Sequence, residues 1–464
     1  MSQDIARLTA LEIAAGVRGR RFTASAVAEV LLARIERLNP EINAYTHVAT
    51  ERALTEAAAV DRAVAEGRDP GILAGVPYSA KNLFDLEDVV TVAGSKINRD
   101  NPPALADATA ISRLKGAGSV CLGATNMGEY AYDFVTINAH DGATHNPHDL
   151  GRSAGGSSGG SGASVAAGLA ALSLGTDTNG SVRVPSSFCG IWGLKPTYGR
   201  LSRAGVFPFA TSLDTVGVFG RDVADLARAL DVLSGPDPRD PVCSSEVFAP
   251  VAPALERGSD GLRIGVLGGY FEAGASPEAA AAVQAVAAAL AARERLDLPE
   301  PGLARAAAYL ITAAEGGQLH RERLAARARD FDPSSRDRFI AGALTPGAWY
   351  LKAQRFRAWW KAQMAEVFSR FDVLIAPATP IRAPTLDQQT FAFNGKDLPV
   401  RANIGLFTQP ITLVGLPVVA APVWSAGPLP IAVQLIGATG AEEALLRVAR
   451  VLEQSGVCKA PVAC

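Results

Sequence analysis

Residues 153–197 read SAGGSSGGSGASVAAGLAALSLGTDTNGSVRVPSSFCGIWGLKPT, and the rest of the chain is organised around them. Glycine and serine crowd this stretch, but apolar blocks such as VAAGLAALSLG and CGIWGL interrupt them, and a flexible Gly/Ser linker has no need of such blocks. Glycines set among residues that must be buried allow the backbone to approach a small molecule closely. The pattern predicts an active-site segment and not a connector.

The composition predicts a globular protein with a sizeable core. Of 464 residues, 48% are hydrophobic and 19% are charged, which argues against global disorder. The 44 basic and 46 acidic residues leave a formal net charge of -2. Because neither sign dominates, the charge gives no argument for a nucleic-acid or membrane partner, and we expect neither.

The cysteines and the N-terminal stretch indicate the compartment. Five widely spaced cysteines without a CxxC pair argue against a disulfide framework and against a structural zinc site. Residues 1–21 carry acidic side chains within their apolar stretch and lack the apolar core of a signal peptide. No segment offers the ~20 uninterrupted apolar residues that a membrane span needs. The sequence therefore predicts a cytoplasmic protein.

The order of the predicted elements favours an α/β fold. Residues 8–38 predict two amphipathic helices, and residues 105–125 predict a helix followed by a buried strand. Another buried strand is expected at 262–269, and residues 277–370 are mostly helical in pattern. Such alternation is typical of a mixed or parallel sheet. We expect one domain over residues 1–464, with 277–370 as a mainly helical insertion.

The segment 155–159, GGSSG, matches the GxSxG motif of α/β-hydrolases. That fold needs a base histidine late in the chain, after the acid. Residues 321–464 contain no histidine. The α/β-hydrolase hypothesis is therefore disfavoured.

Metal and phosphate chemistry also receive little support. A metal site would need His140, His145 and His148 with Asp141 or Asp149, but these lie in a loop and not on one helix face, and HExxH is absent. The glycine run lacks the Lys-Ser/Thr that ends a phosphate-binding loop. We expect no metal and no cofactor.

The remaining chemistry is a serine nucleophile whose base is not histidine. A lysine can serve as the base if burial keeps it neutral near pH 7, and a second serine hydroxyl can relay the proton. Lys81, at the end of the apolar stretch LAGVPYSAK, fits this scheme together with Ser157 and Ser181. Backbone N–H groups in a glycine-containing turn would stabilise the oxyanion.

Over essentially its whole length the chain resembles the amidase signature family. The matching stretches are GVPYSAKNLFD (75–85), GGSSGGS (155–161), GTDTNGSVRVPSSFCGIWGLKPTYGRLSR (175–203), SLDTVG (212–217) and FDVLIAPATP (371–380). The resemblance implies the α/β amidase signature fold, in which a large mixed β-sheet is flanked on both faces by helices.

The same resemblance implies roles for the site residues. It implies a Ser-cisSer-Lys triad, with Ser181 as nucleophile, Ser157 as the cis-serine and Lys81 as base. It also implies an oxyanion hole made by four consecutive N–H groups, those of Thr178, Asn179, Gly180 and Ser181.

Three further residues of this motif concern the shape of the loop. Asn179 stands where the family commonly has glycine, so we expect the geometry of the oxyanion loop or the width of the pocket to differ slightly. Asp177 and Arg183 are expected to hold the loop and to take no part in the chemistry.

Within the family, other stretches resemble the 1-carboxybiuret hydrolases of cyanuric acid breakdown. They are VAGSKINRDNPPALADA (92–108), THNPHDLGR (144–152), ITAAEGGQLH (311–320) and AWYLKAQRFRAWW (348–360). This likeness implies hydrolysis of a C–N bond in 1-carboxybiuret, with release of ammonia. It also implies a small helical partner subunit, similar to the C subunit of tRNA-dependent amidotransferases, in a heterotetramer.

An anionic substrate makes a cation in the pocket physically reasonable. Arg357 is the candidate, because amidotransferase-like relatives place a substrate-contacting arginine in a similar stretch. Further candidates for the pocket are His140, His320, Gln354 and Gln409.

The sequence thus predicts a serine-dependent amidohydrolase that uses no metal. The alternative within the same class is a glutamine-hydrolysing amidotransferase of the A-subunit type or a broad-specificity amidase. The alternative from another class is a non-catalytic scaffold that keeps only the fold. The presence of Lys81, Ser157 and Ser181 argues against the scaffold.

Overall fold

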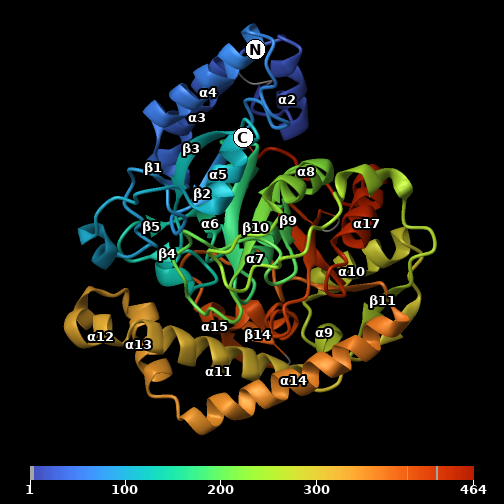
Figure 1. Ribbon diagram of the computed structural model, residues 1–464. Helices are drawn as coiled ribbons and strands as arrows, with labels where there is room; N and C mark the ends of the chain where they lie inside the picture. The colour runs from blue at the N-terminus through green and yellow to red at the C-terminus, as the bar shows by residue number, and fades with distance from the viewer. Residues whose placement is uncertain (1–4, 394, 425–426, 464) are drawn as a thin grey trace.

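The computed structural model describes residues 5–393, 395–424 and 427–463, and an eleven-stranded mixed sheet runs through them (Figure 1). The strand order is β1-β3-β2-β8-β10-β9-β16-β17-β13-β11-β12. The strands of this sheet are β1 (Tyr45–Val48), β2 (Pro77–Lys81), β3 (Val120–Thr125), β8 (Leu172–Asp177), β9 (Trp192–Lys195), β10 (Thr215–Gly220), β11 (Ile264–Leu267), β12 (Glu294–Leu296), β13 (Val373–Pro377), β16 (Val418–Val423) and β17 (Ile431–Gly437).

Helices surround the sheet. The α-helices are α2 (Ala10–Arg18), α3 (Ala24–Ile42), α4 (Thr50–Ala65), α5 (Thr109–Gly116), α6 (Gly159–Ala166), α7 (Arg183–Cys189), α8 (Val223–Leu233), α9 (Tyr270–Ala273), α10 (Pro277–Ala289), α11 (Pro301–Leu319), α12 (Arg321–Arg327), α13 (Pro333–Ala343), α14 (Gly347–Arg370), α15 (Val400–Asn403), α16 (Gln409–Thr412) and α17 (Glu442–Gln454). Short 3-10 helices lie at η1 (Lys96–Asp100), η2 (Glu129–Ala131), η3 (Ala252–Arg257), η4 (Ala328–Asp330) and η5 (Ile404–Leu406).

The remaining strands form short two-stranded pairs outside the main sheet. They are β4 (Ile137–Asn138) with β5 (Gly142–Ala143), β6 (His145–Asn146) with β7 (Asp149–Ser153), and β14 (Thr390–Phe393) with β15 (Lys396–Pro399).

The centre of the sheet is covered on both faces. Every residue of β8, β10, β16 and β17 is buried. Because successive side chains of a strand point to opposite faces, full burial requires packing on each side. The predicted α/β fold with a large mixed sheet is confirmed.

Local sequence signals place the first helices as predicted. The Thr9 hydroxyl accepts a hydrogen bond from the Glu12 N–H, and the Glu12 carboxylate accepts one from the Thr9 N–H, which forms a capping box at the start of α2. The Thr23 hydroxyl caps α3 in a similar way. Residues 19–23 separate the two helices.

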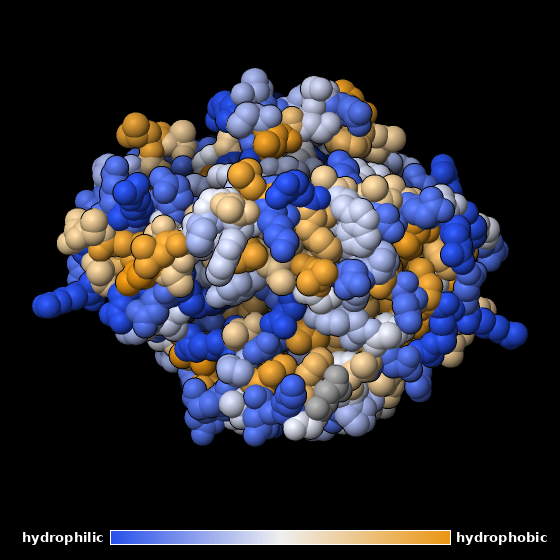
Figure 2. All heavy atoms as spheres, turned by 90° about the horizontal axis from the view of Figure 1, so that it is seen from below, coloured by the Kyte–Doolittle hydropathy of each residue, from blue (hydrophilic) through white to orange (hydrophobic). Residues whose placement is uncertain are grey.

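Residues 277–370 are mainly helical, but the strand β12, which lies among these helices, joins the main sheet. β12 pairs in parallel with β11 and forms the edge of the sheet. α11 and α14 lie side by side along the lower border of the molecule (Figure 1). Seen from that side, the surface mixes hydrophobic patches with hydrophilic residues (Figure 2). None of the helices in the described part of the chain is long and apolar enough to cross a membrane.

The parallel pairing of β2 with β8 is what positions the site. Tyr78 pairs with Leu172 and Ala80 with Leu174, so both strands run in the same direction and end at the same edge of the sheet. The residues that follow the carboxyl ends of such strands meet in one place. Lys81 is the last residue of β2.

Candidate active site

Lys81 is buried, and its amine lies among hydroxyl groups. Nζ is 2.8 Å from Ser157 Oγ and 3.0 Å from Thr176 Oγ1. Burial lowers the pKa of Lys81 to about 7, although the carboxylates of Asp214 and Asp177 act to raise it. A large share of this amine is therefore neutral at neutral pH and able to accept a proton.

The turn that carries Ser157 is tightly enclosed. The peptide bond between Gly156 and Ser157 is cis, which is the conformation that the family resemblance implies. The Gly128 N–H donates a hydrogen bond of 3.1 Å to the Ser157 carbonyl oxygen. A Cβ at Gly156 would lie 2.5 Å from the backbone nitrogen of Val135, so only glycine fits there. The orientation of Ser157 is thus set by the surrounding backbone.

An ion pair holds the loop between β8 and α7, on which Ser181 lies. Arg183 donates to the Asp177 carboxylate from Nε at 2.9 Å and from Nη2 at 2.8 Å, and both side chains are fully buried. Burial would raise the pKa of Asp177, but the Arg183 guanidinium brings it below the ordinary value. The prediction that this pair holds the loop is confirmed.

The loop is fixed through groups other than its N–H donors. The Thr408 hydroxyl donates a hydrogen bond of 2.5 Å to the Asn179 carbonyl oxygen. Gly180 has a φ of 138°, and a Cβ there would lie 2.3 Å from Thr408 Oγ1. Within the described residues, the N–H groups of 178–181 donate no hydrogen bond to the protein. Four adjacent donors are therefore available to a developing oxyanion.

Side chains of the same loop anchor it to neighbouring segments. The Thr178 hydroxyl donates to Asp214 Oδ1 at 2.6 Å, and Asn179 Nδ2 donates to Thr312 Oγ1 at 2.8 Å. Thr312 belongs to α11. Asn179 thus ties the β8–α7 loop to a helix of the 277–370 segment.

Ser181 lines a small pocket, and one of the other side chains around this pocket is the positively charged Arg338. The residues around it include Tyr132, Asn179, Ser181, Phe209, Arg338 and Gln409. The Arg338 guanidinium lies 3.6 Å from the centre of the Tyr132 ring, and its Nη1 donates to the Tyr132 carbonyl oxygen at 2.7 Å. A second cavity of about 290 Å³ shares Ala131, Thr178 and Phe209 with this pocket, but Ser181 does not line it.

Two glutamines and Arg357 have different positions. Gln409 lines the Ser181 pocket, where its Oε1 accepts a hydrogen bond of 3.0 Å from Arg305 Nε. Arg357 and Gln354 line a separate pocket, and Arg357 donates to the Ser212 carbonyl oxygen at 2.8 Å. The structure therefore brings Gln409, but not Arg357 or Gln354, to the pocket that Ser181 lines.

The histidine candidates make contacts elsewhere. His140 Nε2 lies 3.0 Å from Glu129 Oε1. His320 is buried among aromatic rings, with the centre of its ring 4.0 Å from that of Tyr130, and burial lowers its pKa to about 3. Neither histidine is among the residues around the Ser181 pocket.

The loop histidines first considered for metal binding are held by carbonyl oxygens. His145 Nδ1 lies 2.6 Å from the Leu150 oxygen, and His148 Nε2 lies 3.0 Å from the Cys189 oxygen. Across the described ranges, no group of three or more His, Cys, Asp or Glu side chains is arranged to hold a metal ion.

Arg338 is the pocket residue that sequence reasoning missed. It lies on α13, a short and polar helix in which it looks like any surface arginine. The packing of α13 against α11 and against Tyr132 brings it to the pocket that Ser181 lines. No sequence signal short of a comparison with relatives would separate it from Arg336 on the same helix.

A family model described as amidase matches residues 26–446. The chain is also 51% identical to the AtzE component of the 1-carboxybiuret hydrolase of Pseudomonas sp. (strain ADP), over 97% of this chain and 99% of that relative. The chain belongs to the amidase signature family. As an amidase it is a hydrolase that acts on carbon–nitrogen bonds.

Other members of the amidase family are similar over the same length. The A-type component of the glutamyl-tRNA(Gln) amidotransferase of Moorella thermoacetica is 38% identical, with 97% of this chain and 96% of the relative covered. A solved structure of a vestigial protein complex, said to reveal the origins of an s-triazine catabolic enzyme, matches with a TM-score of 0.97 at 51% identity, over 98% of this chain and 100% of that chain. A 6-aminohexanoate cyclic dimer hydrolase matches with a TM-score of 0.85 at 30% identity, over 97% of both chains.

Proposed function

We propose that this amidase hydrolyses a C–N bond of a small, anionic, urea-like substrate, 1-carboxybiuret, and releases ammonia. The observation that carries the proposal is the buried amine of Lys81, 2.8 Å from Ser157 Oγ, with a pKa that burial lowers to about 7. The choice of substrate is supported by the 51% identity with a component of a 1-carboxybiuret hydrolase over nearly the whole chain.

In the proposed cycle, Ser181 Oγ attacks the substrate carbonyl carbon. Its proton passes to Ser157 Oγ as the Ser157 proton passes to Lys81. The N–H groups of residues 178–181 receive the negative charge on the carbonyl oxygen, and one such donor is worth about 2.7–4 kcal/mol of transition-state stabilisation. The C–N bond then breaks, the relay returns the proton to the nitrogen, and ammonia leaves. Water attacks the acyl-enzyme by the same route and frees Ser181.

Arg338 is the proposed partner of the substrate carboxylate. It lines the pocket onto which Ser181 opens, whereas Arg357 lines another one. A planar guanidinium can bind a carboxylate with two parallel hydrogen bonds, which favours an anionic substrate over a neutral amide. Arg338 therefore replaces Arg357 as the expected cation, and Gln409 stays beside it as a polar group of the pocket.

A panel of amides tests the proposal directly. Ammonia release would be measured with 1-carboxybiuret, biuret, L-glutamine and an aryl amide. We expect 1-carboxybiuret to be the preferred substrate and Ser181→Ala to lose about 10³-fold or more of the turnover. A fluorophosphonate probe should label Ser181 in the parent protein but not in this variant. Absence of both labelling and turnover would support the non-catalytic scaffold instead, and full activity of Ser181→Ala would exclude the triad.

The amidotransferase alternative predicts a different preference. The 38% identity with the amidotransferase relative is the observation that favours it. In that case L-glutamine would release ammonia faster than 1-carboxybiuret, most of all with a partner protein present. The same panel distinguishes the two functions.

We also propose a small helical partner protein, in a heterotetramer. A relative whose own name makes it part of an assembly, and a similar structure described as a protein complex, support an assembly of several chains. α14 runs along the lower border of the molecule (Figure 1), the side from which Figure 2 is seen. It exposes Trp349, Leu351 and Trp359, which are 57%, 62% and 41% accessible. The exposed cations Lys352 and Arg355 lie among them. An acidic amphipathic helix would cover the apolar side chains and offset these charges.

Co-expression with neighbouring small reading frames tests the partner. A stable complex that Trp359→Glu disrupts would support the proposed surface. If the chain alone is fully active, an obligate partner is excluded.

A further inference from the structure

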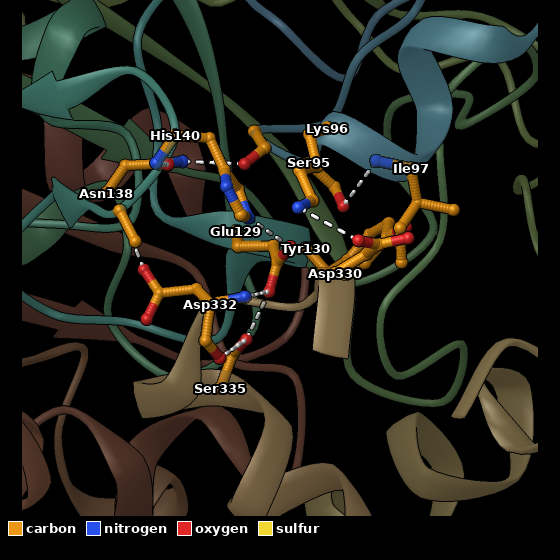
Figure 3. A network of polar contacts seen from close by, with 12 residues as sticks. Ser95, Lys96, Ile97, Glu129, Tyr130, Asn138, His140, Asp330, Asp332 and Ser335 are labelled. Carbon is orange, nitrogen blue, oxygen red and sulfur yellow. Dashed lines mark hydrogen bonds and ion pairs between the residues drawn. The ribbon is translucent and has the colours of Figure 1, made fainter. Parts of the chain in front are cut away.

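Glu129 joins two parts of the site that are far apart in the sequence. Its carboxylate is buried, and Oε1 lies 3.0 Å from His140 Nε2. Oε2 accepts a hydrogen bond of 2.8 Å from the Asp332 N–H and another from the Ser335 hydroxyl. Figure 3 shows Glu129 between His140 on one side and Asp332 with Ser335 on the other. Asp332 caps α13 and Ser335 lies in its first turn, and this is the helix that carries Arg338.

The segment around Glu129 also contacts both functional ends of the pocket. The Gly128 N–H donates to the Ser157 carbonyl oxygen at 3.1 Å. Tyr132 supplies the carbonyl oxygen and the ring that hold the Arg338 guanidinium. Residues 128–132 therefore link the catalytic turn with α13.

Helix geometry explains how a bond at Ser335 affects Arg338. Residues three apart lie on the same face of an α-helix, so Ser335 and Arg338 project to the same side of α13. The bond from Ser335 to the buried Glu129 carboxylate therefore acts on the side of α13 from which Arg338 projects. A separate tie remains at the cap, where Asp332 Oδ2 accepts a hydrogen bond of 2.9 Å from the Ala139 N–H.

We propose that Glu129 is a positioning residue whose hydrogen bonds to the first turn of α13 set the place of Arg338 in the pocket, and with it the affinity for an anionic substrate. The inference rests on the proposed function, in which Arg338 binds the substrate carboxylate. If Glu129 only stabilised the fold, its replacement would lower the melting temperature without a selective effect on KM for an anion.

Ser335→Ala is the sharpest test. It removes the bonds of the Ser335 hydroxyl to Glu129 and to the Asp332 carbonyl oxygen, and it leaves the Asp332 N–H bond to Glu129 and the Ala139 N–H bond to Asp332 in place. With 1-carboxybiuret, or L-glutamine if the panel selects it, we expect KM to rise on the order of 10-fold. The kcat and the rate of Ser181 labelling by a neutral fluorophosphonate should stay within about twofold. Glu129→Ala should raise KM in the same way, and Glu129→Gln, which keeps an acceptor oxygen, should restore much of the affinity. Asp337→Ala, an exposed change on the same helix, is the matched control and should leave KM unchanged.

Arg338→Met separates this inference from the proposed function. If it raises KM for the anion but Ser335→Ala and Glu129→Ala do not, the positioning role is excluded while carboxylate binding by Arg338 stands. An unchanged KM in Arg338→Met overturns both. Adding Ser335→Ala to Arg338→Met should have no further effect on KM, because the group to be positioned is already lost. An additive rise, or an equal fall in kcat and in labelling, contradicts the proposal.

Discussion

Lys81 can act as a base only while its amine is neutral. Its buried position lowers the pKa to about 7, and the adjacent Ser157 hydroxyl is the group that would pass it a proton. The protonation equilibrium of the Lys81 amine therefore controls the proposed reaction, and its pKa lies within the physiological pH range.

The pH dependence of catalysis should follow from this pKa. Below about pH 7 the amine is protonated and cannot accept the Ser157 proton, so kcat/KM should fall toward acid, approaching tenfold per pH unit. A profile of kcat/KM between pH 5 and 9 measures it. Lys81→Arg, which keeps the charge but cannot be deprotonated, should be inactive throughout. A rate that stays flat down to pH 5 would exclude Lys81 as the base.

The β8–α7 loop shows how one element prepares the site. A fully buried ion pair between Asp177 and Arg183 closes it, and Thr408 bonds the Asn179 carbonyl oxygen from outside. These contacts use side chains and carbonyl oxygens, so the N–H groups of 178–181 remain available within the described structure. Stabilisation of the oxyanion by this loop would therefore depend on its backbone shape, whereas the proposed nucleophile is the Ser181 side chain.

Gly180→Ala should disturb that shape. The new Cβ would lie 2.3 Å from Thr408 Oγ1 at a φ of 138°, so the loop must shift and misplace the oxyanion donors. We expect kcat to fall about 10²–10³-fold, measured with the preferred amide. Gly456→Ala is the control, since that glycine also has a positive φ, of 74°, but has open space around it. It should cost some stability and leave kcat unchanged. Equal effects of the two variants on kcat would argue against donor placement.

At the scale of the whole molecule, the packing of the fold buries ionisable side chains that the proposed chemistry does not use. Lys195, at the end of β9, is fully buried, and its Nζ donates to the Pro196 carbonyl oxygen at 3.0 Å. Burial lowers its pKa from the ordinary 10.5 to about 7, against the influence of Asp177. This group makes the stability of the fold depend on pH.

Lys195→Met should remove that dependence. Between about pH 7 and the ordinary pKa of 10.5, the unfolded chain binds a proton at Lys195 that the folded chain does not, so the stability of the parent rises with pH. The free energy of unfolding of the variant minus that of the parent should therefore fall by up to about 1.4 kcal/mol per pH unit across this window. Denaturant titrations at pH 7, 8 and 9 measure it, with the exposed Lys115→Met as control. A difference that does not change with pH would contradict the buried, neutral lysine.

The sequence by itself determined the fold class, the helices near the N-terminus and the motif that carries Lys81, Ser157 and Ser181. These depend on signals local to the chain: alternating burial, capping residues, and glycines where no side chain fits. The loop-holding role of Asp177 and Arg183 could be predicted for the same reason, because the two residues stand six positions apart at the two ends of one loop.

Only the tertiary structure decided which cation shares the pocket with Ser181. Arg338 and Arg357 lie on successive polar helices, and nothing in their local sequence separates a pocket arginine from a surface one. The choice depends on how α13 packs against α11 and against the segment that holds Glu129 and Tyr132. The hydrogen bonds of Glu129 to Asp332 and Ser335 join positions about two hundred residues apart. Contacts between distant segments follow from the burial of whole elements against one another, which no local pattern encodes.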